Sequence, residues 1–482
     1  MQYSIEAKEY GTYDVVVCGA GTAGVCAAIA AARQGAKTLL IERTFTVGGM
    51  LTLGDGGITK FTEHCDDVDK YKKEVLDVLS TNPKSVQVVG GIAEEYVKRL
   101  IDKGTGMGTG KNAGSYVFTD RIDAQWTLID MLREAGVEVL YDTRVCLANM
   151  DGDALQSIVV CNKEGFLEIK AKRFIDTTGD ADLAALAGVD FHFGASQADV
   201  DMGGAVAVGQ TQHVGTMYRV RDVDYHALFD WLEANPDRFV QHEFGVMSLE
   251  NVRKSYDEGE MCVFRFLMDT PVGDGKTELL PVQVYNLPIK DEAILLGKMN
   301  AVHNVDGLNA KDISRSQDAL QVGVRAMNEV LRNQIPGFEN VKAVFIPDVG
   351  IRETRHIIGE YSLTAVDVLT GRDFEDSIGC GGHPIDIHPL PPEVEDMEMN
   401  HWRFHIPYGI MVPKKIENLL VAGRSVSGER VAIGAIRPTA QCMVMGEAAG
   451  VAAAISIEDN STCRKVDVKK LRDTLIKGGA IL

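Results

Sequence analysis

The sequence predicts an α/β fold in which a parallel sheet and a β-meander form one domain, with an α+β domain inserted into it. Two observations predict this fold. A short apolar strand, a glycine-rich turn and an alanine-rich helix follow one another over residues 13–33, the order of a parallel sheet covered by helices. A second apolar strand with a glycine turn, followed by a small-residue helix, occupies residues 418–454. We therefore expect both ends of the chain to build the same domain.

The composition is that of a globular protein with an acidic surface. Hydrophobic residues make up 45% and charged residues 24% of the 482 residues, and this length is too great for one ordinary core. The formal net charge is −20 and no basic run interrupts it, so nucleic-acid backbones and anionic membranes are repelled. We expect a small-molecule substrate and no nucleic-acid or membrane partner, and assembly into a homo-oligomer is left open.

The N-terminal residues and the cysteines indicate a reduced, cytoplasmic protein. The first residues are polar and of mixed charge, unlike a secretory signal, and we expect no uninterrupted apolar stretch long enough to span a bilayer. Nine cysteines are dispersed along the chain without a C-x-x-C pair. This pattern disfavours a disulfide framework, a zinc site and a dithiol-disulfide reductase, and we expect no metal.

The first strand, residues 13–18, leads into a phosphate-binding fingerprint. Gly19 permits the tight strand-to-helix turn, Gly21 lets the backbone approach a pyrophosphate, and Gly24 lets the helix pack closely on the strand. Free N–H groups at the start of the helix then hold the phosphates. The residues expected to contact the nucleotide here are Gly19, Ala20, Gly21, Thr22, Ala23 and Gly24.

The next strand, residues 37–42, ends on an acid that indicates which nucleotide is bound. Glu42 lies 21 residues after Gly21 and can accept hydrogen bonds from a ribose diol, whereas a phosphorylated ribose would meet like charge there. NADP is therefore disfavoured. A glycine-rich loop follows and resembles the stretch along the flavin in glutathione-reductase-type flavoproteins, which favours FAD over NAD. The candidate contacts of this segment are Glu42, Arg43, Gly48, Gly49 and Met50.

The middle of the domain is expected to contain a helix, a meander and a returning strand. Residues 120–135 have the spacing of an amphipathic helix, with Gly136 as its stop. Three β-prone segments, 137–149, 157–162 and 165–171, are divided by turn pairs and predict an antiparallel meander. Residues 173–178 then form a buried strand. The expected cofactor contacts are Val145, Thr178, Gly179 and Asp180, although Asp180 and Asp182 could also serve as helix N-caps.

The remaining segments complete the domain plan. We expect an FAD-binding part at 1–195, an inserted substrate or cap domain at 196–340 with helices at 222–234 and 309–334, and a second FAD-binding part at 341–482. In the last part, residues 418–424 form a buried strand whose glycine turn supplies Gly423 and Arg424. A helix starting at Gly446, with Ala449, would direct N–H donors and its positive dipole end at the flavin. Close helix packing is the alternative.

Motifs along nearly the whole chain resemble the FAD-dependent oxidoreductase family with the glutathione-reductase/fumarate-reductase type of FAD-binding domain. They are Val17-Cys-Gly-Ala-Gly-Thr-Ala-Gly24, Phe174-Ile-Asp-Thr-Thr-Gly-Asp180, and segments 350–359, 384–388, 406–408, 418–424 and 446–450. The resemblance implies bound FAD, a Rossmann-like FAD-binding domain and hydride transfer at flavin N5. Glutathione reductases themselves match less well, because the redox-active cysteine pair and a second glycine fingerprint are missing.

The densest polar group in the sequence lies in the C-terminal part. Arginines could hold a carboxylate or polarise a carbonyl, and a histidine or tyrosine could transfer the proton. The candidate catalytic residues are Arg352, Arg355, His356, Tyr361, His388 and Arg437. Alternatively, Arg352 and Arg355 pair with Glu353, Glu360 or Asp376 and fasten the domains together.

Three functions remain open from the sequence. The first is an FAD-dependent oxidoreductase that transfers a hydride between flavin N5 and a small polar organic metabolite. The second is reduction of an activated C=C bond in the manner of a fumarate reductase. The third, of another class, is a flavin-fold binding or carrier protein.

Overall fold

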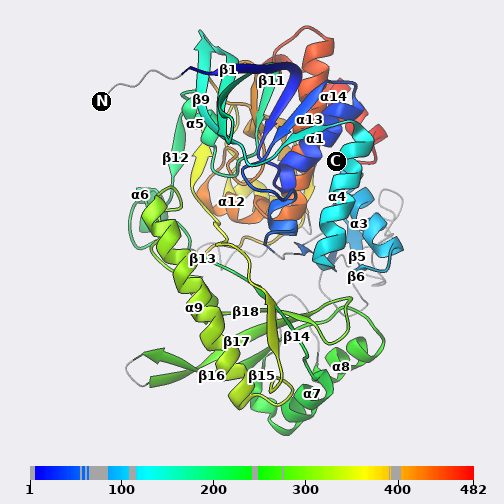
Figure 1. Ribbon diagram of the computed structural model, residues 1–482, viewed down its shortest axis with the longest axis vertical. Coiled ribbons are helices and arrows are strands. Elements are labelled where there is room, and N and C mark those ends of the chain that lie inside the picture. Colours follow the sequence, from blue (N-terminus) through cyan, green and yellow to red (C-terminus); the bar gives the residue numbers. More distant parts are fainter. Residues whose placement is uncertain are drawn as a thin grey trace.

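The computed structural model describes residues 6–54, 57–59, 62–64, 85–107, 116–240, 248–273, 276–389, 391 and 403–482. Figure 1 shows two parts, one carrying elements from both ends of the chain and one built mostly from the green middle of the sequence. Segments from both ends therefore share one part, as the sequence predicts. The boundaries at residues 195 and 340 stay a prediction.

A seven-stranded sheet is the core of the part that carries both ends of the chain, the upper part in Figure 1. Its order is β8-β2-β1-β11-β10-β9, with β24 paired to β11, and β8, β2, β1, β11 and β24 run parallel. The strands are β1 (Lys8–Cys18), β2 (Thr38–Ile41), β8 (Glu138–Leu140), β9 (Arg144–Asp151), β10 (Ala154–Asn162), β11 (Gly165–Asp176) and β24 (Leu419–Val421). This is the predicted α/β architecture, a Rossmann-like sheet carrying a meander.

The meander differs from the prediction in two places. Segments 165–171 and 173–178 are not separate strands but one strand, β11, which pairs with β10 over its first half and with β24 at its end. The strand is continuous because β1 pairs with it through both halves, from Leu167 to Asp176. Segment 137–149, predicted as one strand, is split into β8 and β9 near Asp142, whose φ of 50° breaks the extended backbone.

Helices α1 (Thr22–Arg33) and α13 (Thr439–Glu458) pack closely on one face of this sheet. A Cβ on Gly446 would lie 2.1 Å from the Ala23 carbonyl oxygen, and one on Gly450 would lie 2.2 Å from that of Ala27. Only glycine permits this approach. The predicted helix start at Gly446 is wrong, because α13 begins at Thr439, and the alternative of close packing accounts for both glycines.

Helix α13 is long and apolar enough to be compared with a membrane-spanning helix, although Glu447 interrupts its apolar run. By length and composition it could cross a membrane, with a mean hydropathy of 1.4 over its best window. In the structure 94% of that window is buried inside the protein. A core helix passes the same composition test, so the length of α13 is explained by its packing on α1 and the sheet.

The part built mostly from the middle of the sequence, the lower part in Figure 1, contains a six-stranded sheet. Its order is β15-β16-β17-β18-β14-β20. Its strands are β14 (Tyr218–Arg221), β15 (Phe239–Val240), β16 (Val263–Gly273), β17 (Lys276–Asn286), β18 (Ala293–Gly297) and β20 (Lys342–Phe345), and its helices are α7 (Tyr225–Ala234), α8 (Leu249–Asp257) and α9 (Ala310–Gln334). The predicted helices at 222–234 and 309–334 are confirmed as α7 and α9. Asn309 caps α9 by accepting the N–H groups of Lys311 and Asp312.

Two small antiparallel sheets bring distant segments together. Strand β13 (Val214–Gly215) pairs with β19 (Ala301–Val302), and Gly215 also bridges to Gly350. Strand β12 (Phe191–Phe193) pairs with β21 (Arg355–Ile357). Further elements are α3 (Gly91–Asp102), α5 (Asp182–Leu186), α10 (Ala365–Thr370), β22 (Ser377–Gly381) and α12 (Arg430–Ile436).

Candidate active site

The predicted cofactor residues gather at one edge of the upper sheet. Gly19 follows β1, Glu42 follows β2, Thr178–Asp180 follows β11, and Gly423 lies just beyond β24. Because these strands are parallel, their carboxyl ends meet at the same edge, where open α/β sheets bind their ligands. We call this group of turns, together with the 48–49 loop, the cofactor cradle.

The cradle has the shape that a dinucleotide pyrophosphate requires. Gly19 has a φ of 100° and a Cβ there would lie 2.6 Å from the Thr177 carbonyl oxygen, so only glycine fits the turn. Gly21 has open space where its Cβ would point. The N-cap of α1 is Gly21, which brings no side chain to cap the described helix, and the first turn holds no acidic residue. Its free N–H groups therefore face an open position suited to phosphate, and the residues present fit FAD.

The other predicted contacts lie around this position. Glu42 accepts hydrogen bonds from the Ala20 N–H at 2.7 Å and from the Thr44 N–H and hydroxyl at 2.8 and 2.9 Å. A carboxylate offers about four acceptor positions, so capacity for a ribose hydroxyl remains. Gly48 donates its N–H to the Ala20 carbonyl at 2.7 Å, which holds the second glycine loop against the first. These contacts to FAD stay predictions.

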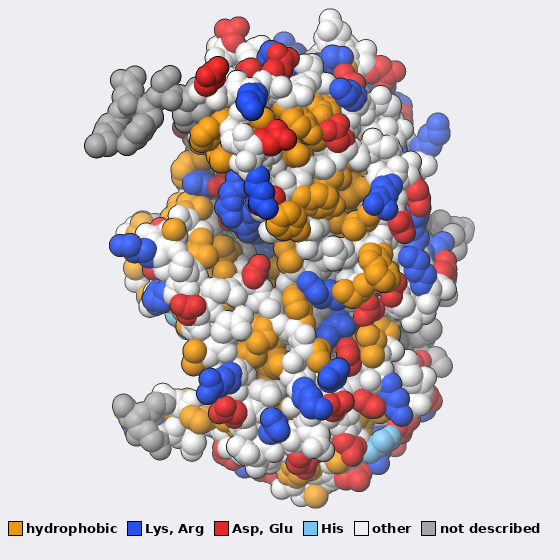
Figure 2. All heavy atoms as spheres, in the orientation of Figure 1, with side chains coloured by type: hydrophobic (Ala, Val, Ile, Leu, Met, Phe, Trp, Pro, Cys, Tyr) orange, Lys and Arg blue, Asp and Glu red, His pale blue; other side chains and the backbone are white. Residues whose placement is uncertain are grey.

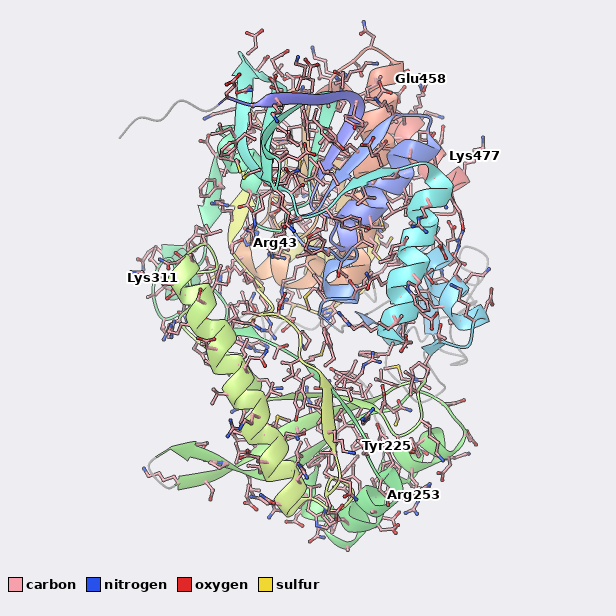
Figure 3. All side chains as sticks on the ribbon, viewed as in Figure 1. Arg43, Tyr225, Arg253, Lys311, Glu458 and Lys477 are labelled. Carbon is pink, nitrogen blue, oxygen red and sulfur yellow. The ribbon has the colours of Figure 1, made fainter. Side chains whose placement is uncertain are left out.

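Met50, Arg43 and Val145 border the same region. Met50 is 43% exposed, Arg43 is exposed and Val145 is half-buried on β9. Figure 3 labels Arg43 where the upper part faces the middle of the molecule. Figure 2 shows Lys and Arg side chains gathered in the same area, although the chain as a whole is acidic. Local positive charge at this edge is compatible with a phosphate ligand.

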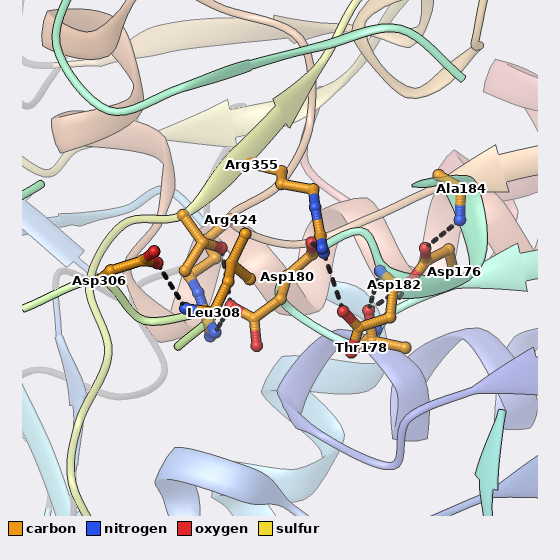
Figure 4. Close-up of polar contacts among 10 residues, drawn as sticks. Asp176, Thr178, Asp180, Asp182, Ala184, Asp306, Leu308, Arg355 and Arg424 are labelled. Atoms are coloured by element: carbon orange, nitrogen blue, oxygen red, sulfur yellow. Dashed lines mark hydrogen bonds and ion pairs between the residues drawn. The ribbon is translucent and has the colours of Figure 1, made fainter. Parts of the chain in front are cut away.

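An ion pair joins the turns after β11 and β24 (Figure 4). Asp180 Oδ1 accepts from Arg424 Nη2 and from the Thr354 hydroxyl, both at 2.7 Å. Burial alone raises the pKa of Asp180, but the charge of Arg424 and these hydrogen bonds outweigh it, and the pKa is lowered. Gly179 leaves the space that the guanidinium fills, since its Cβ would lie 2.6 Å from Arg424 Nη1. Asp180 is therefore no N-cap.

Two of the predicted catalytic residues are engaged elsewhere. Arg355 donates to the Asp180 carbonyl at 2.8 Å and pairs with Asp182 at 2.9 Å, so it fastens β21 to the turn after β11. The partners of Arg355 are thus Asp180 and Asp182, not the predicted Glu353, Glu360 or Asp376. The Tyr361 hydroxyl donates to Asp367 at 2.7 Å, within the cap of α10. Neither side chain joins the other catalytic candidates.

His356 lies beside the cradle as a buried neutral imidazole. It is 3% exposed, and neither ring nitrogen makes a hydrogen bond within the part of the chain that the structure describes. Burial lowers its pKa to about 4 against a backbone contact with Arg424. A buried polar ring without partners has unused capacity for a ligand or water.

The remaining candidates form a second group with residues that the sequence analysis missed. Arg437 donates to both the carbonyl and the carboxylate of Asp386, at 2.9 and 2.5 Å, and His388 Nε2 lies 3.1 Å from Asp386 Oδ1. The His213 ring lies 5.6 Å from that of His388 and 5.2 Å from that of His303. We call this group the histidine–arginine cluster; its members are His213, His303, Arg352, Asp386, His388 and Arg437.

Strand register explains why His213 and His303 were missed. Val214 faces Val302 in the β13–β19 pair, so His213 and His303 are opposite each other just outside it. The Gly215–Gly350 bridge similarly brings Arg352 to His213, whose carbonyl accepts from Arg352 Nη1 at 2.9 Å. These strands are two residues long, and only the presence of histidines in the inserted segment could have been a signal.

Charges within the cluster are unevenly paired. Arg352 forms no ion pair with a carboxylate among the described residues, and burial together with the nearby Arg437 lowers its pKa to about 10. Burial and the charge of Arg352 also lower the pKa of His213 to about 3, so its ring is neutral near pH 7. A partly buried arginine without an acid is unusual and indicates a place for an anion.

The cluster adjoins the cradle through the first turn of α13. The Cys442 thiol lies 3.1 Å from the Arg437 carbonyl oxygen, and its pKa responds to the charges of both Arg424 and Arg437. Gln441, in the same turn, is fully buried, and neither amide atom is hydrogen-bonded to a residue that the structure describes. A buried ion pair between Glu353 and Arg430, at 2.8 Å, lies between the two groups.

Fold and site together define a flavoprotein of the Rossmann-like class, with a nucleotide cradle and an adjoining polar site. Comparison with known families then identifies it further. The chain belongs to the FAD dependent oxidoreductase family, whose model matches residues 14–475. The protein is thus an FAD-dependent oxidoreductase.

Individual relatives have low sequence identity to this chain, and most align with it over only part of their length. NADH:fumarate oxidoreductase of Klebsiella pneumoniae is 27% identical over 195 residues, which cover 35% of this chain and 20% of that enzyme. Fumarate reductase (cytochrome) of Shewanella frigidimarina is 24% identical over 286 residues, 52% of this chain and 47% of the relative. A geranylgeranyl bacteriochlorophyll reductase-like structure from Thermoplasma acidophilum aligns at 15% identity and a TM-score of 0.41, covering 97% of this chain and 83% of that one.

Proposed function

We propose that this oxidoreductase transfers a hydride between FAD and a small polar organic metabolite bound at the histidine–arginine cluster. The observation that carries the proposal is Arg352, a partly buried arginine without a carboxylate partner among the described residues, in a cluster next to the cofactor cradle. FAD supplies the hydride chemistry when it is bound. Arg352 and Arg437 would then hold and orient a polar group of the substrate.

Proton transfer is the second task of the cluster. His213 is neutral near pH 7 and can accept a proton, and its pKa would rise when an anion neutralises Arg352 beside it. His388 and His303 are more exposed and lie within ring contact of His213, so they provide a route for the proton towards solvent. His356 is a second candidate, next to the backbone of Arg424 in the cradle.

Reduction of an activated C=C bond is a second candidate reaction. The neighbouring arginines Arg352 and Arg437 favour it, because they could polarise a conjugated carboxylate and raise the electrophilicity of the double bond. The names of the Klebsiella and Shewanella relatives point the same way. Each of those relatives matches over less than half its length, so the reaction is proposed for this chain on its arginines.

Anaerobic absorbance spectroscopy of the flavin tests both substrate oxidation and substrate reduction. The FAD-loaded protein would be mixed with hydroxy acids, sugars and amines, and loss of the oxidised-flavin absorbance would identify a substrate for oxidation. The chemically reduced protein would be mixed with enoates, and return of that absorbance would identify a substrate for reduction. Protein that cannot take up FAD, or whose flavin reacts with no compound of either set, would contradict the proposal.

A further inference from the structure

The charge balance of the histidine–arginine cluster restricts what it can bind. Arg352 and Arg437 contribute two positive charges, and Asp386 contributes one negative charge. Burial alone raises the pKa of Asp386, but the hydrogen bond with His388 and the charges of Arg437, His383 and Arg352 outweigh it and hold the pKa well below its usual range. Asp386 is therefore ionised, and the three groups leave one positive charge.

Among the described residues, the neighbouring Glu353 and His213 do not change this balance. Glu353, whose pKa also responds to the charge of Arg437, pairs with Arg430 at 2.8 Å, and both side chains are almost completely buried. His213 is neutral near pH 7. Arg352 is held only by the His213 carbonyl, so its charge is the one left without a partner among the described residues.

We propose that Asp386 is the specificity-determining residue of this site and that it restricts the substrate to small organic monoanions, such as monocarboxylates. This inference rests on the proposed function and adds the class of substrate. Asp386 already occupies Arg437, so one carboxylate of an incoming molecule can pair with Arg352. A second carboxylate would approach Asp386 itself, and juxtaposed like charges cost several kcal/mol in a partly buried site.

Asp386 is well placed for this selection. Its side chain is 36% exposed, and its partner His388 is 63% exposed, so the acid stands between the solvent and the more buried Arg437, which is 12% exposed. Its backbone is fixed as well, because the Asp386 carbonyl accepts from Arg437, and Gly434 of α12 packs directly on it. The carboxylate is thus held in one place at the mouth of the cluster.

A size-matched pair of ligands separates charge from shape. Succinate carries two carboxylates, and succinamate has an amide in place of one of them. Titration of the FAD-loaded protein, followed by the flavin absorbance spectrum and by calorimetry, should show succinamate binding at least about tenfold more tightly than succinate. In Asp386→Asn, which keeps the size of the side chain, the preference should reverse, because the variant leaves both arginines without an acid.

The matched control is Asp269→Asn. Asp269 also pairs with an arginine, Arg238 at 3.2 Å, but it lies on β16 in the other sheet. This variant should keep the preference of the wild-type protein. Wild-type preference for succinate, or an unchanged preference in Asp386→Asn, would overturn the inference.

The wild-type comparison alone decides the matter if Asp386→Asn does not fold, since equal binding of the two ligands also overturns the inference. The outcome is distinct from that of the proposed function. If succinamate binds with the expected preference while no compound oxidises or reduces the flavin, the proposed reaction fails and the assignment of Asp386 stands. If substrates react but succinate and succinamate bind equally, the reaction stands and the assignment fails.

Discussion

The cofactor cradle and the histidine–arginine cluster lie next to each other but differ in whether their arginines are paired with acids. In the cradle two arginines are matched with acids, as Arg424 pairs with Asp180 and Arg355 with Asp182. In the cluster Arg352 has no acid, and Arg437 shares the single carboxylate of Asp386 with His388. The cradle is complete apart from backbone donors at the start of α1, whereas the cluster lacks a counter-charge.

This difference teaches which ligand each region is prepared for. A permanently bound cofactor can be held by shape and by N–H groups whose positions are fixed by the strand ends, so the nearby charges need no exchangeable partner. A substrate must enter and leave, and an arginine that lacks a partner until the substrate arrives gives binding energy to that substrate alone.

The largest expected effect comes from closing the cradle. Gly19→Ala would place a Cβ 2.6 Å from the Thr177 carbonyl oxygen at a φ of 100°, so the turn must shift. We expect the purified variant to lack FAD, measured by flavin absorbance after purification. Gly35→Ala is the control, because Gly35 also has a positive φ of 87° but nothing lies within 4 Å of its Cβ position. The control should retain FAD and lose only about 1–2 kcal/mol of stability.

Glu447 is a buried acid that belongs to neither region, and it shows how a carboxyl group without an ion-pair partner affects stability. It lies on α13, accepts the Ile92 N–H at 2.9 Å and has no ion-pair partner among the described residues. Burial raises its pKa from 4.5 to about 7, the opposite direction to Asp180. The stabilisation from its bound proton is complete below pH 4.5 and is lost as the pH rises through about 7.

We therefore expect Glu447→Gln to remove part of the pH dependence of stability. The amide stays neutral and its oxygen can still accept the Ile92 N–H. Relative to the wild type, the variant should gain roughly 3 kcal/mol in free energy of unfolding between about pH 5 and pH 8. Denaturant unfolding at both pH values measures this. Parallel pH profiles for the two proteins would mean that Glu447 is ionised without cost.

Arg352→Gln separates the two regions directly. Removing the arginine without an acid should weaken succinamate binding by about 2 kcal/mol, or roughly thirtyfold, and raise the KM of any substrate accordingly. The affinity for FAD should not change, because Arg352 contacts the His213 carbonyl and not the cradle. Calorimetry with succinamate and fluorescence titration with FAD test both parts. A common loss of both affinities would show that the regions are one site.

His388→Gln should have the smallest effect. His388 is 63% exposed, so its ion pair with Asp386 is screened by solvent and contributes less than about 1 kcal/mol. We expect a change of a few-fold in succinamate affinity and a slower proton-transfer step, seen as a lower kcat in the pH profile. A large loss of affinity would instead place His388 in direct contact with the ligand.

The cradle could be predicted from the sequence because the residues that form each of its turns are close together in the chain. Gly19, Gly21 and Gly24 are fixed by one turn between a strand and its helix, and the acid at Glu42 is fixed by the strand that follows. The structure places these turns at one sheet edge because parallel strands align their carboxyl ends. The exception is Gly446, where a small-residue helix indicated a helix start facing the flavin, but the glycine instead permits close contact with α1.

The cluster could not be predicted in the same way because it depends on tertiary assembly. Arg352, Arg355, His356 and Tyr361 are close in sequence, yet their side chains turn to different neighbours, Tyr361 to the cap of α10 and Arg355 to Asp182. Residues far apart replaced them: His213 and His303 reach Arg352 only through the β13–β19 pair and the Gly350 bridge. Such short pairings leave no periodic pattern.

Strand β11 has a consequence for how the protein is made. It pairs with β10 through its first half early in the chain, but the partner of its last three residues, β24, follows more than two hundred residues later. During translation the N-terminal half of the cradle can form while Arg424, the partner of Asp180, has still to be synthesised. The ion pair that joins the two halves of the cradle is therefore a late event, because it forms only after the whole middle segment of the chain has been synthesised.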